Sequence, residues 1–448
     1  MRQLQADDSA TAAVLCRFGS NRLLGPALPS RTQIPMQLKN IIRVCPICFA
    51  SAIPLIRMCV AAGEPPNDPG SRWSAEQYAR KTIYHSVQKP GYTCWLGAWQ
   101  MPDLSLMITF KEVTGPAQGR PRAKVEWQEA FGLMKVDPAR DFTGLHMADM
   151  YLRSTNGGSN WSEVAEAAYA GPSIGYAWGG SHCPLPDGAI LRAVDGSAVP
   201  GMNLPRRVFF QRSQDLGRTW GQPEVPPEPS RPVTNYLGDF GDCVTRIRRM
   251  QDGRLVATGV KRYDPDPAKR MIGEPVVMFS DREGRNWKPL RIELKPEQRG
   301  SSVWDEWDST ELRDGNFLCV FRRGDPKTKN SRETRWQGLL QKKSDSWAIE
   351  QYHAAPFQHS GHPELLATRE GPVLHIATDG IYWTENTGVS WHRLSFKGLN
   401  QPYRSCYYPR SFQLADGKIY VFSHQGSDDP YGKTDQAIIM DTFRLTRK

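Results

Sequence analysis

The sequence predicts an all-β fold, a six-bladed β-propeller of four-stranded antiparallel blades, with seven blades as the structural alternative. The composition and two repeated patterns lead to this prediction. The 448 residues include 39 glycines, 35 prolines and 14 tryptophans, and a chain with many turns and many aromatic residues favours β structure. A hydrophobic share of 39% excludes a disordered chain and is sufficient for a large core.

The first repeated pattern is a tight turn with Asp-Gly, or a variant of it, followed by an apolar strand. Glycine tolerates the positive φ that a tight hairpin turn requires, so each copy predicts a β-hairpin. A spacing of about 60 residues suits a four-stranded blade, and six turns imply six blades. The copies occupy residues 101–106, 185–190, 250–255, 312–317, 369–373 and 414–419.

The second pattern is an octet with Ser or Thr first, Gly fifth and Trp eighth. A short polar side chain in the third position, as in Asp215, bonds to neighbouring backbone N–H groups and fixes the turn, while the tryptophan packs between sheets. Arg282 departs from this pattern. The copies are STNGGSNW at 154–161, SQDLGRTW at 213–220, SDREGRNW at 280–287 and TENTGVSW at 384–391, with a shortened form at 343–347.

These octets resemble the Asp-box, or BNR repeat, of the sialidase (neuraminidase) superfamily. The resemblance covers roughly residues 80–448 and implies the six-bladed propeller for which this superfamily is known. The Asp-boxes are structural in that family, so they receive no catalytic role here.

Ionisable residues gather at the positions that line the channel of such a propeller. The innermost strand of each blade faces the channel, and residues two apart on a strand share a face. A cluster of ionisable groups in one channel is typical of an active site. Eight residues before the turn stand Trp95, Gly179, Val244, Glu306, His362 and Tyr408; six before it stand Gly97, Ser181, Arg246, Asp308, Glu364 and Arg410; eight after it stand Lys111, Asp195, Val260, Arg322, Thr378 and His424.

The resemblance also implies roles for individual residues. Residues 304–315, continuing to Arg322, are similar to the sialidase segment in which a Glu opens the inner strand and an Arg closes the hairpin. By this resemblance Glu306 is the base for a tyrosine nucleophile, Tyr408 or Tyr407, and Arg322 belongs to an arginine triad that binds the substrate carboxylate. The predicted catalytic residues are Glu306, Tyr408, Tyr407, His362 and Asp308, and the predicted substrate-binding residues are Arg322, Arg410, Arg404, Arg246, His85, His182, Trp95 and His424.

The sequence departs from the sialidase pattern in two places. Thr93 stands where the family has the arginine of its first Arg-Ile-Pro segment, so sialidase activity would require another arginine in that space. The aspartate general acid of the family has no clear counterpart, whereas His85, His182 and His362 stand near the starts of blades.

Three functions remain open. The first is an exo-glycosidase of sialidase type that cleaves a terminal acidic sugar. The second is a polysaccharide lyase or rhamnosidase-like enzyme, in which Tyr, His and Arg side chains abstract the proton beside a uronate carboxylate. The third is a non-catalytic propeller whose tryptophans stack on sugar rings. The family resemblance favours the hydrolase.

The charge and the cysteines limit the partners. A formal net charge of +10 favours an anionic glycan, and the scattered basic residues lack the motifs of nucleic-acid-binding proteins. Nine cysteines, widely spread, indicate neither a disulfide scaffold nor a metal cluster. We expect no cofactor; the sequence leaves open only a structural divalent cation at Asp428-Asp429 near His424, which no regular ligand spacing supports.

The N-terminal part has the layout of a secretory signal peptide. Residues 36–62 contain a positively charged start, an almost wholly apolar run over 44–56, and small residues at its exit. We therefore expect residues 1–35 to be a disordered upstream extension, and the mature chain to be secreted or periplasmic. The apolar run is too short for a membrane span, and no transmembrane segment is expected.

Overall fold

The computed structural model describes residues 72–88, 92–116, 118–123, 125, 128, 141, 143–168, 181–195, 208–225, 242–263, 272–298, 306–323, 334–358, 362–425 and 436–448. They belong to a compact unit that spans Ala62–Lys448. The predicted upstream extension, the predicted signal peptide and the Asp428-Asp429 pair lie outside the described residues. The described part of the chain contains no helix long and apolar enough to span a membrane.

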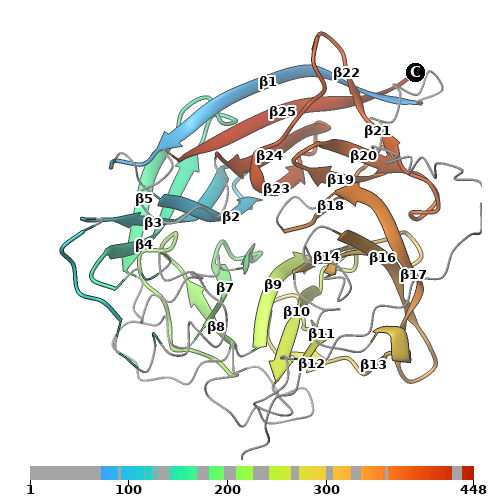
Figure 1. The fold of residues 1–448 in the computed structure, drawn as a ribbon, viewed down its shortest axis with the longest axis horizontal. Helices are drawn as coiled ribbons and strands as arrows, with labels where there is room; N and C mark the ends of the chain where they lie inside the picture. The colour runs from blue at the N-terminus through green and yellow to red at the C-terminus, as the bar shows by residue number, and fades with distance from the viewer. Residues whose placement is uncertain are drawn as a thin grey trace, which may run out of the picture. The chain divides into compact units, whose positions relative to one another are not determined.

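The described strands form six sheets around a common centre, which confirms the predicted six-bladed propeller (Figure 1). Each innermost strand contacts the innermost strand of the next blade, and the last contacts the first, so the ring is closed. The innermost strands are β2 (Tyr92–Gln100), β6 (Ser181–Pro184), β9 (Asp242–Arg249), β14 (Trp307–Glu311), β18 (Glu364–Ala367) and β23 (Tyr407–Gln413).

Each blade continues outward in antiparallel order. The further strands are β3 (Leu106–Thr114), β4 (His146–Ser154) and β5 (Ser162–Ala168) in blade one; β7 (Ile190–Asp195) and β8 (Val208–Ser213) in blade two; β10 (Leu255–Tyr263), β11 (Ile272–Phe279) and β12 (Lys288–Pro289) in blade three; β15 (Phe317–Arg323), β16 (Thr334–Lys342) and β17 (Trp347–Gln358) in blade four; β19 (Val373–Ala377), β20 (Gly380–Thr384) and β21 (His392–Arg393) in blade five; and β24 (Lys418–His424), β25 (Ala437–Arg447) and β1 (Trp73–His85) in blade six.

Short elements complete three of these blades. In blade two, Phe210 forms an isolated bridge with Glu224 beyond β8. The parallel strands β13 (Ile292–Glu293) and β22 (Ser395–Phe396) extend blades four and six at β17 and β1. A 3₁₀ turn, η3, spans Pro296–Gln298.

Blade six combines both ends of the propeller sequence. The antiparallel ladder between β1 and β25 runs from the pair Trp73–Arg447 to the pair His85–Ala437, and the two strands lie side by side in Figure 1. The resemblance predicts a propeller from about residue 80, whereas β1 begins at Trp73. This ladder closes the ring by backbone hydrogen bonds between its first and last strands.

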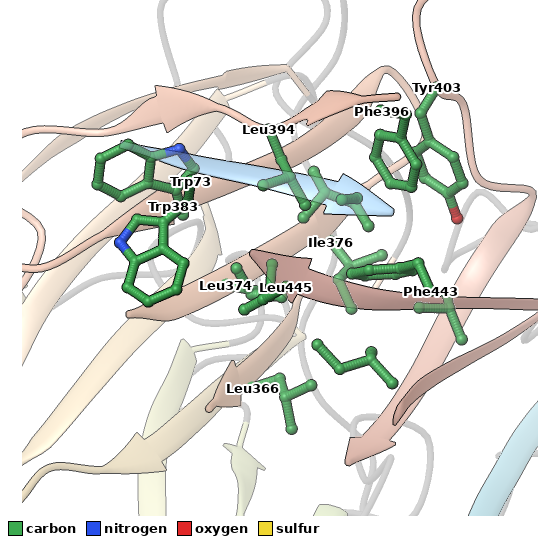
Figure 2. Close-up of a cluster of buried hydrophobic side chains, with 14 residues drawn as sticks. Trp73, Leu366, Leu374, Ile376, Trp383, Leu394, Phe396, Tyr403, Phe443 and Leu445 are labelled. Carbon is green, nitrogen blue, oxygen red and sulfur yellow. The ribbon is translucent and has the colours of Figure 1, made fainter. Parts of the chain in front are cut away.

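Apolar side chains fill the spaces between blades. Figure 2 shows the cluster that joins blades five and six. Trp73 of β1, Trp383 of β20 and Phe443 of β25 are at most 5% exposed, and the Trp73 indole N–H donates to Glu385 Oε1 at 3.0 Å. The closing strand β1 is therefore held by packing as well as by its ladder.

The hairpins between first and second strands have the predicted geometry. A glycine adopts positive φ in five of the six turns, for example Gly253 with φ of 88°, and Leu104 with φ of 67° takes this place in blade one. In the five turns with an aspartate, this side chain accepts the backbone N–H two residues further on, as Asp252 Oδ1 does from Arg254 at 2.9 Å. This local bond explains why an acid precedes the glycine. In blade five the acid is Glu370, and Pro372 has no N–H to donate.

The octets also form the locked turns that the sequence predicts. Asp215 Oδ1 accepts the backbone N–H four residues on at 2.8 Å, and Asn156 and Asn386 accept the equivalent bonds at 2.9 Å. In the copy with Arg282 in third position, Asp281 makes this bond instead at 2.7 Å. The four tryptophans pack against buried clusters between sheets.

Candidate active site

Three side chains from two blades meet at the centre of the propeller; we call Glu306, Arg322 and Tyr408 the central triad. The Tyr408 hydroxyl donates to Glu306 Oε1 at 2.5 Å, and Arg322 Nη1 donates to Glu306 Oε2 at 2.5 Å. The exposed fractions are 1% for Tyr408, 2% for Glu306 and 7% for Arg322. The carboxylate therefore holds the phenol with one oxygen and the guanidinium with the other, through short charge-assisted hydrogen bonds.

The backbone positions the triad in two ways. The Arg322 N–H donates to the Glu306 carbonyl at 2.8 Å, next to the β14–β15 ladder, so the two residues stand opposite one another. On β23 the ladder to β24 is irregular between Tyr407 and Arg410, and Tyr408 has φ of 50°. Bulges and left-handed non-glycine residues occur often at functional sites because they redirect a side chain.

Aromatic rings surround the Tyr408 phenol. The ring centroid of Trp95 lies 4.5 Å away in an edge contact, and that of Tyr407 lies 4.6 Å away. His424 stacks at 5.8 Å and His362 lies at 6.3 Å. These four sequence-predicted residues are therefore brought together with the central triad, and they hold the phenol in one orientation.

The two central histidines are neutral. Burial, followed by the charges of Arg410 and Arg246, lowers the pKa of His362 well below 6.5, and burial lowers the pKa of His424 to about 3. His362 Nδ1 lies 2.7 Å from the Pro363 carbonyl oxygen, which can only accept, and 3.4 Å from Arg410 Nη1, which can only donate. We assign the proton to Nδ1 on the shorter of these two contacts. His362 Nε2 is then a proton-free acceptor.

A buried ion-pair layer lies two residues further along the inner strands. Asp308 accepts from Arg248 Nη2 at 2.6 Å and faces Arg246 Nε at 3.3 Å, while Glu364 pairs with Arg246 and lies 3.7 Å from Arg410 Nη1. Burial raises the pKa of Asp308, but the two arginines lower it more, so its pKa falls below the ordinary value. Asp308 thus binds Arg246 and Arg248, and Glu364 binds Arg246 and Arg410. This network joins blades three to six.

His182 lies between blades one and two. Its Nε2 is 3.0 Å from the Tyr151 hydroxyl, and its ring stacks on Trp99 with centroids 5.3 Å apart. His182 stands an odd number of residues before its turn, at Asp187, and therefore faces away from the channel positions. The structure brings it to an interface between blades and not to the central triad.

Two further sequence-predicted residues also lie elsewhere. His85 ends β1, the outer strand of blade six, with Nδ1 2.9 Å from the Ser86 carbonyl oxygen. Arg404 is exposed in the segment before β23, and its carbonyl oxygen accepts from Arg80 Nη2 at 2.6 Å. Neither has a described contact with the central triad.

Arg335 is a residue of the site that the sequence did not predict. This residue lies on β16 directly opposite Arg322 and is 1% exposed. Burial and the charge of Arg322 lower the pKa of Arg335 to about 10, while Glu306, Tyr407 and Tyr408 act in the opposite direction. A second guanidinium therefore lies within electrostatic reach of the triad. The signal that would have found it is cross-strand register, because residues directly opposite one another share a face.

The position of Thr93 is buried, and its backbone N–H donates to Gln436 Oε1 at 3.0 Å. An additional arginine near the triad, Arg335, comes from blade four. Within the described ranges, no group of three or more His, Cys, Asp or Glu residues is placed to hold a metal ion.

No family model and no curated protein matches this chain, but solved structures do. A protein of unknown function from Dyadobacter fermentans matches with a TM-score of 0.52 and 14% identity over 82% of this chain and 99% of that one. An α-L-arabinofuranosidase from Fusarium graminearum matches with a TM-score of 0.52 and 12% identity, over 82% and 97%. An intramolecular trans-sialidase from Ruminococcus gnavus matches with a TM-score of 0.52 and 10% identity, over 81% and 96%. At these identities the likeness shows the fold alone.

Proposed function

We propose that this chain is a glycoside hydrolase of sialidase type that removes a terminal acidic sugar from a glycan, with Tyr408 as nucleophile. The observation that carries this proposal is the 2.5 Å hydrogen bond from the Tyr408 hydroxyl to Glu306 in a buried centre. A phenol needs an adjacent base to act as a nucleophile. The presence of an arabinofuranosidase and a trans-sialidase among the similar structures supports the choice of a glycan as substrate.

In the first step, the Tyr408 oxygen bonds to the anomeric carbon and its proton passes to Glu306. The bond to the leaving sugar breaks, and an acid supplies a proton to the leaving oxygen. In the second step, water attacks the anomeric carbon, and the bond between this carbon and the Tyr408 oxygen breaks. The conjugate base of that acid takes a proton from the water, and the Tyr408 oxygen recovers its proton from Glu306. His362 is not that acid, because its Nε2 carries no proton.

Two features support an acidic sugar. Arg322 and Arg335 lie at the triad, and guanidinium groups bind carboxylates through paired hydrogen bonds. A neutral phenol also avoids the repulsion that a carboxylate nucleophile would meet beside an anionic substrate. Secretion of the enzyme remains a prediction from the sequence.

Turnover of a panel of sialosides and uronate-containing glycans tests the proposal. We expect release of a free acidic sugar by the wild type and a loss of kcat of at least about 10²-fold in Tyr408→Phe and Glu306→Gln. Tyr407→Phe is the comparison variant, because it removes the neighbouring phenol, whose ring centroid lies 4.6 Å from that of Tyr408. Full activity of Tyr408→Phe together with inactivity of Tyr407→Phe would contradict the proposal and assign the role of nucleophile to Tyr407.

The closeness of His362, Tyr408 and Arg410 favours a second candidate, elimination beside a uronate carboxylate, in which an arginine neutralises the acidic group. A product lighter by one water that absorbs in the ultraviolet would identify this lyase. If no substrate of the panel is turned over while glycans still bind, the propeller is a binding protein.

A further inference from the structure

A cavity of about 370 Å³ lies apart from the central triad, at the outer part of blade six. We call it the rim cavity; it is lined by Tyr78 and Arg80 of β1, by Leu399 and by residues 401–404, which lead from β22 towards β23. None of these residues belongs to the central triad or to the ion-pair layer. Its volume is in the range of small-ligand sites.

The walls of the rim cavity are held by one buried carboxylate. Asp441 is 0% exposed and accepts from Arg80 through both oxygens, at 2.7 and 2.8 Å. The hydroxyls of Tyr78 and Tyr403 also donate to Asp441, at 3.1 and 2.8 Å. Burial, together with the charge of Asp441, raises the pKa of Tyr78 to about 12, so its hydroxyl stays a donor. The cavity is therefore formed before any ligand arrives.

The rim cavity has an excess of positive charge. The residues that line it include two arginines, Arg80 and Arg404, and no aspartate or glutamate. Asp441, which is not part of the lining, neutralises the charge of Arg80. The exposed Arg404 guanidinium has no ion-pair partner among the described residues. An arginine in this state binds a carboxylate or sulfate through a fork of two N–H groups.

The remaining lining suits a sugar ring. Tyr78 and Tyr403 meet edge to face at 5.8 Å, and with Leu399 and Pro402 they offer apolar surface to the C–H groups of a ring. Gln401 adds an amide that both donates and accepts. A hollow with apolar walls and a few converging polar groups is the usual form of a small-ligand site.

We propose that the rim cavity binds an anionic sugar and that the Arg404 guanidinium forms an ion pair with its acidic group. This inference does not depend on catalysis at the centre. A chain that processes acidic glycans would gain a second contact with the same polymer through this site.

Calorimetric titration of the full chain tests the inference, with glucuronic acid and glucose 6-sulfate as probes and glucose and inorganic sulfate as references. We expect Arg404→Ala to weaken binding of both acidic probes by about tenfold or more, because a charge-assisted hydrogen bond is lost. Arg404→Lys should show a smaller loss, since it keeps the charge without the fork. Arg285→Ala is the matched control, as that side chain is 60% exposed in an octet of blade three.

Tyr408→Phe separates this site from the centre and should leave the Arg404-dependent binding unchanged. Unfolding temperatures of all variants confirm that they are folded. Binding to Arg404→Ala as tight as to the wild type would overturn the inference. So would equal affinities for glucose and glucuronic acid, or for inorganic sulfate and glucose 6-sulfate, because the charge or the sugar ring would then contribute nothing.

Discussion

At the scale of single residues, His375 shows how burial decides the charge of a side chain. It lies on β19 with 0% exposure, and its ring stacks on Phe357 with centroids 4.2 Å apart and 1° between the planes. Burial, followed by the charge of Arg335, lowers the pKa of His375 from 6.5 to about 3. The folded chain therefore keeps this imidazole neutral over a range in which the unfolded chain binds a proton.

We expect His375→Phe to make the chain less sensitive to acid. In the wild type, the contribution of His375 to the free energy of unfolding is complete above pH 6.5. It falls as the pH decreases towards 3, because in this range only the unfolded state binds a proton at this residue. The loss is about 2 kcal/mol at about pH 5, and phenylalanine removes it while keeping a flat ring between the same neighbours. Urea unfolding at neutral pH and at about pH 5 measures the difference.

His146→Phe is the control for this experiment, because its side chain is 59% exposed. An acid-induced loss of stability in His375→Phe as large as that of the wild type would contradict the expected effect of burial.

The central triad could be predicted from sequence because each member stands at a fixed distance from a recognisable turn. Arg335 could not be predicted in this way. It is found from the register between β15 and β16, which places it opposite Arg322, and the length of residues 324–333 does not determine that register. His182 shows a different limit. Its distance from the turn correctly predicts that His182 lies on an inner strand. The face of the strand depends on the alternation of side chains along it, and this alternation places the His182 ring against Trp99.

At the scale of elements, the octet turns depend on a close contact beneath their glycine. Gly217 has φ of 95°, and a Cβ added there would lie 2.9 Å from ring carbons of Tyr151. Tyr151 is 0% exposed, so its ring has no room to move away. The glycine is therefore required both by the backbone and by the neighbouring blade.

Gly217→Ala should lower the free energy of unfolding by about 2–4 kcal/mol, since it combines a strained φ with overpacking. Gly315→Ala is the matched control: Gly315 has φ of 79°, but nothing lies within 4 Å of the added Cβ, so about 1 kcal/mol of strain remains. Guanidinium unfolding followed by circular dichroism measures both. Equal losses would show that the Tyr151 contact contributes nothing.

The positions of these elements could be predicted, because turn chemistry is local. Asp252 and Gly253 form their hairpin with bonds between near neighbours, so distant parts of the chain have little influence. The same locality explains the exceptions. Leu104 adopts positive φ without being a glycine, and Asp281 replaces the third-position side chain, because each turn needs the geometry and not one fixed residue.

At the scale of the whole molecule, the closure of the ring could not be predicted from the repeats. β1 lies outside the six turn units in sequence, yet it pairs with β25 at the other end of the propeller. Pairing between strands so far apart in sequence depends on the apolar side chains of blades five and six and on the free edge of β25, which exist only once the rest of the propeller has folded. No local signal in residues 73–85 indicates this partner.

Trp73→Ala tests whether packing of β1 is needed to close the ring. Trp73 is 5% exposed within the cluster between blades five and six (Figure 2), so its truncation should lower the free energy of unfolding by about 3–5 kcal/mol. Thr82→Ala, at an exposed position of the same strand, should change it by less than about 0.5 kcal/mol. Both variants keep the backbone ladder, so the difference between their guanidinium midpoints reports the packing alone. If the two midpoints coincide, the ladder to β25 holds the ring closed without help from the tryptophan.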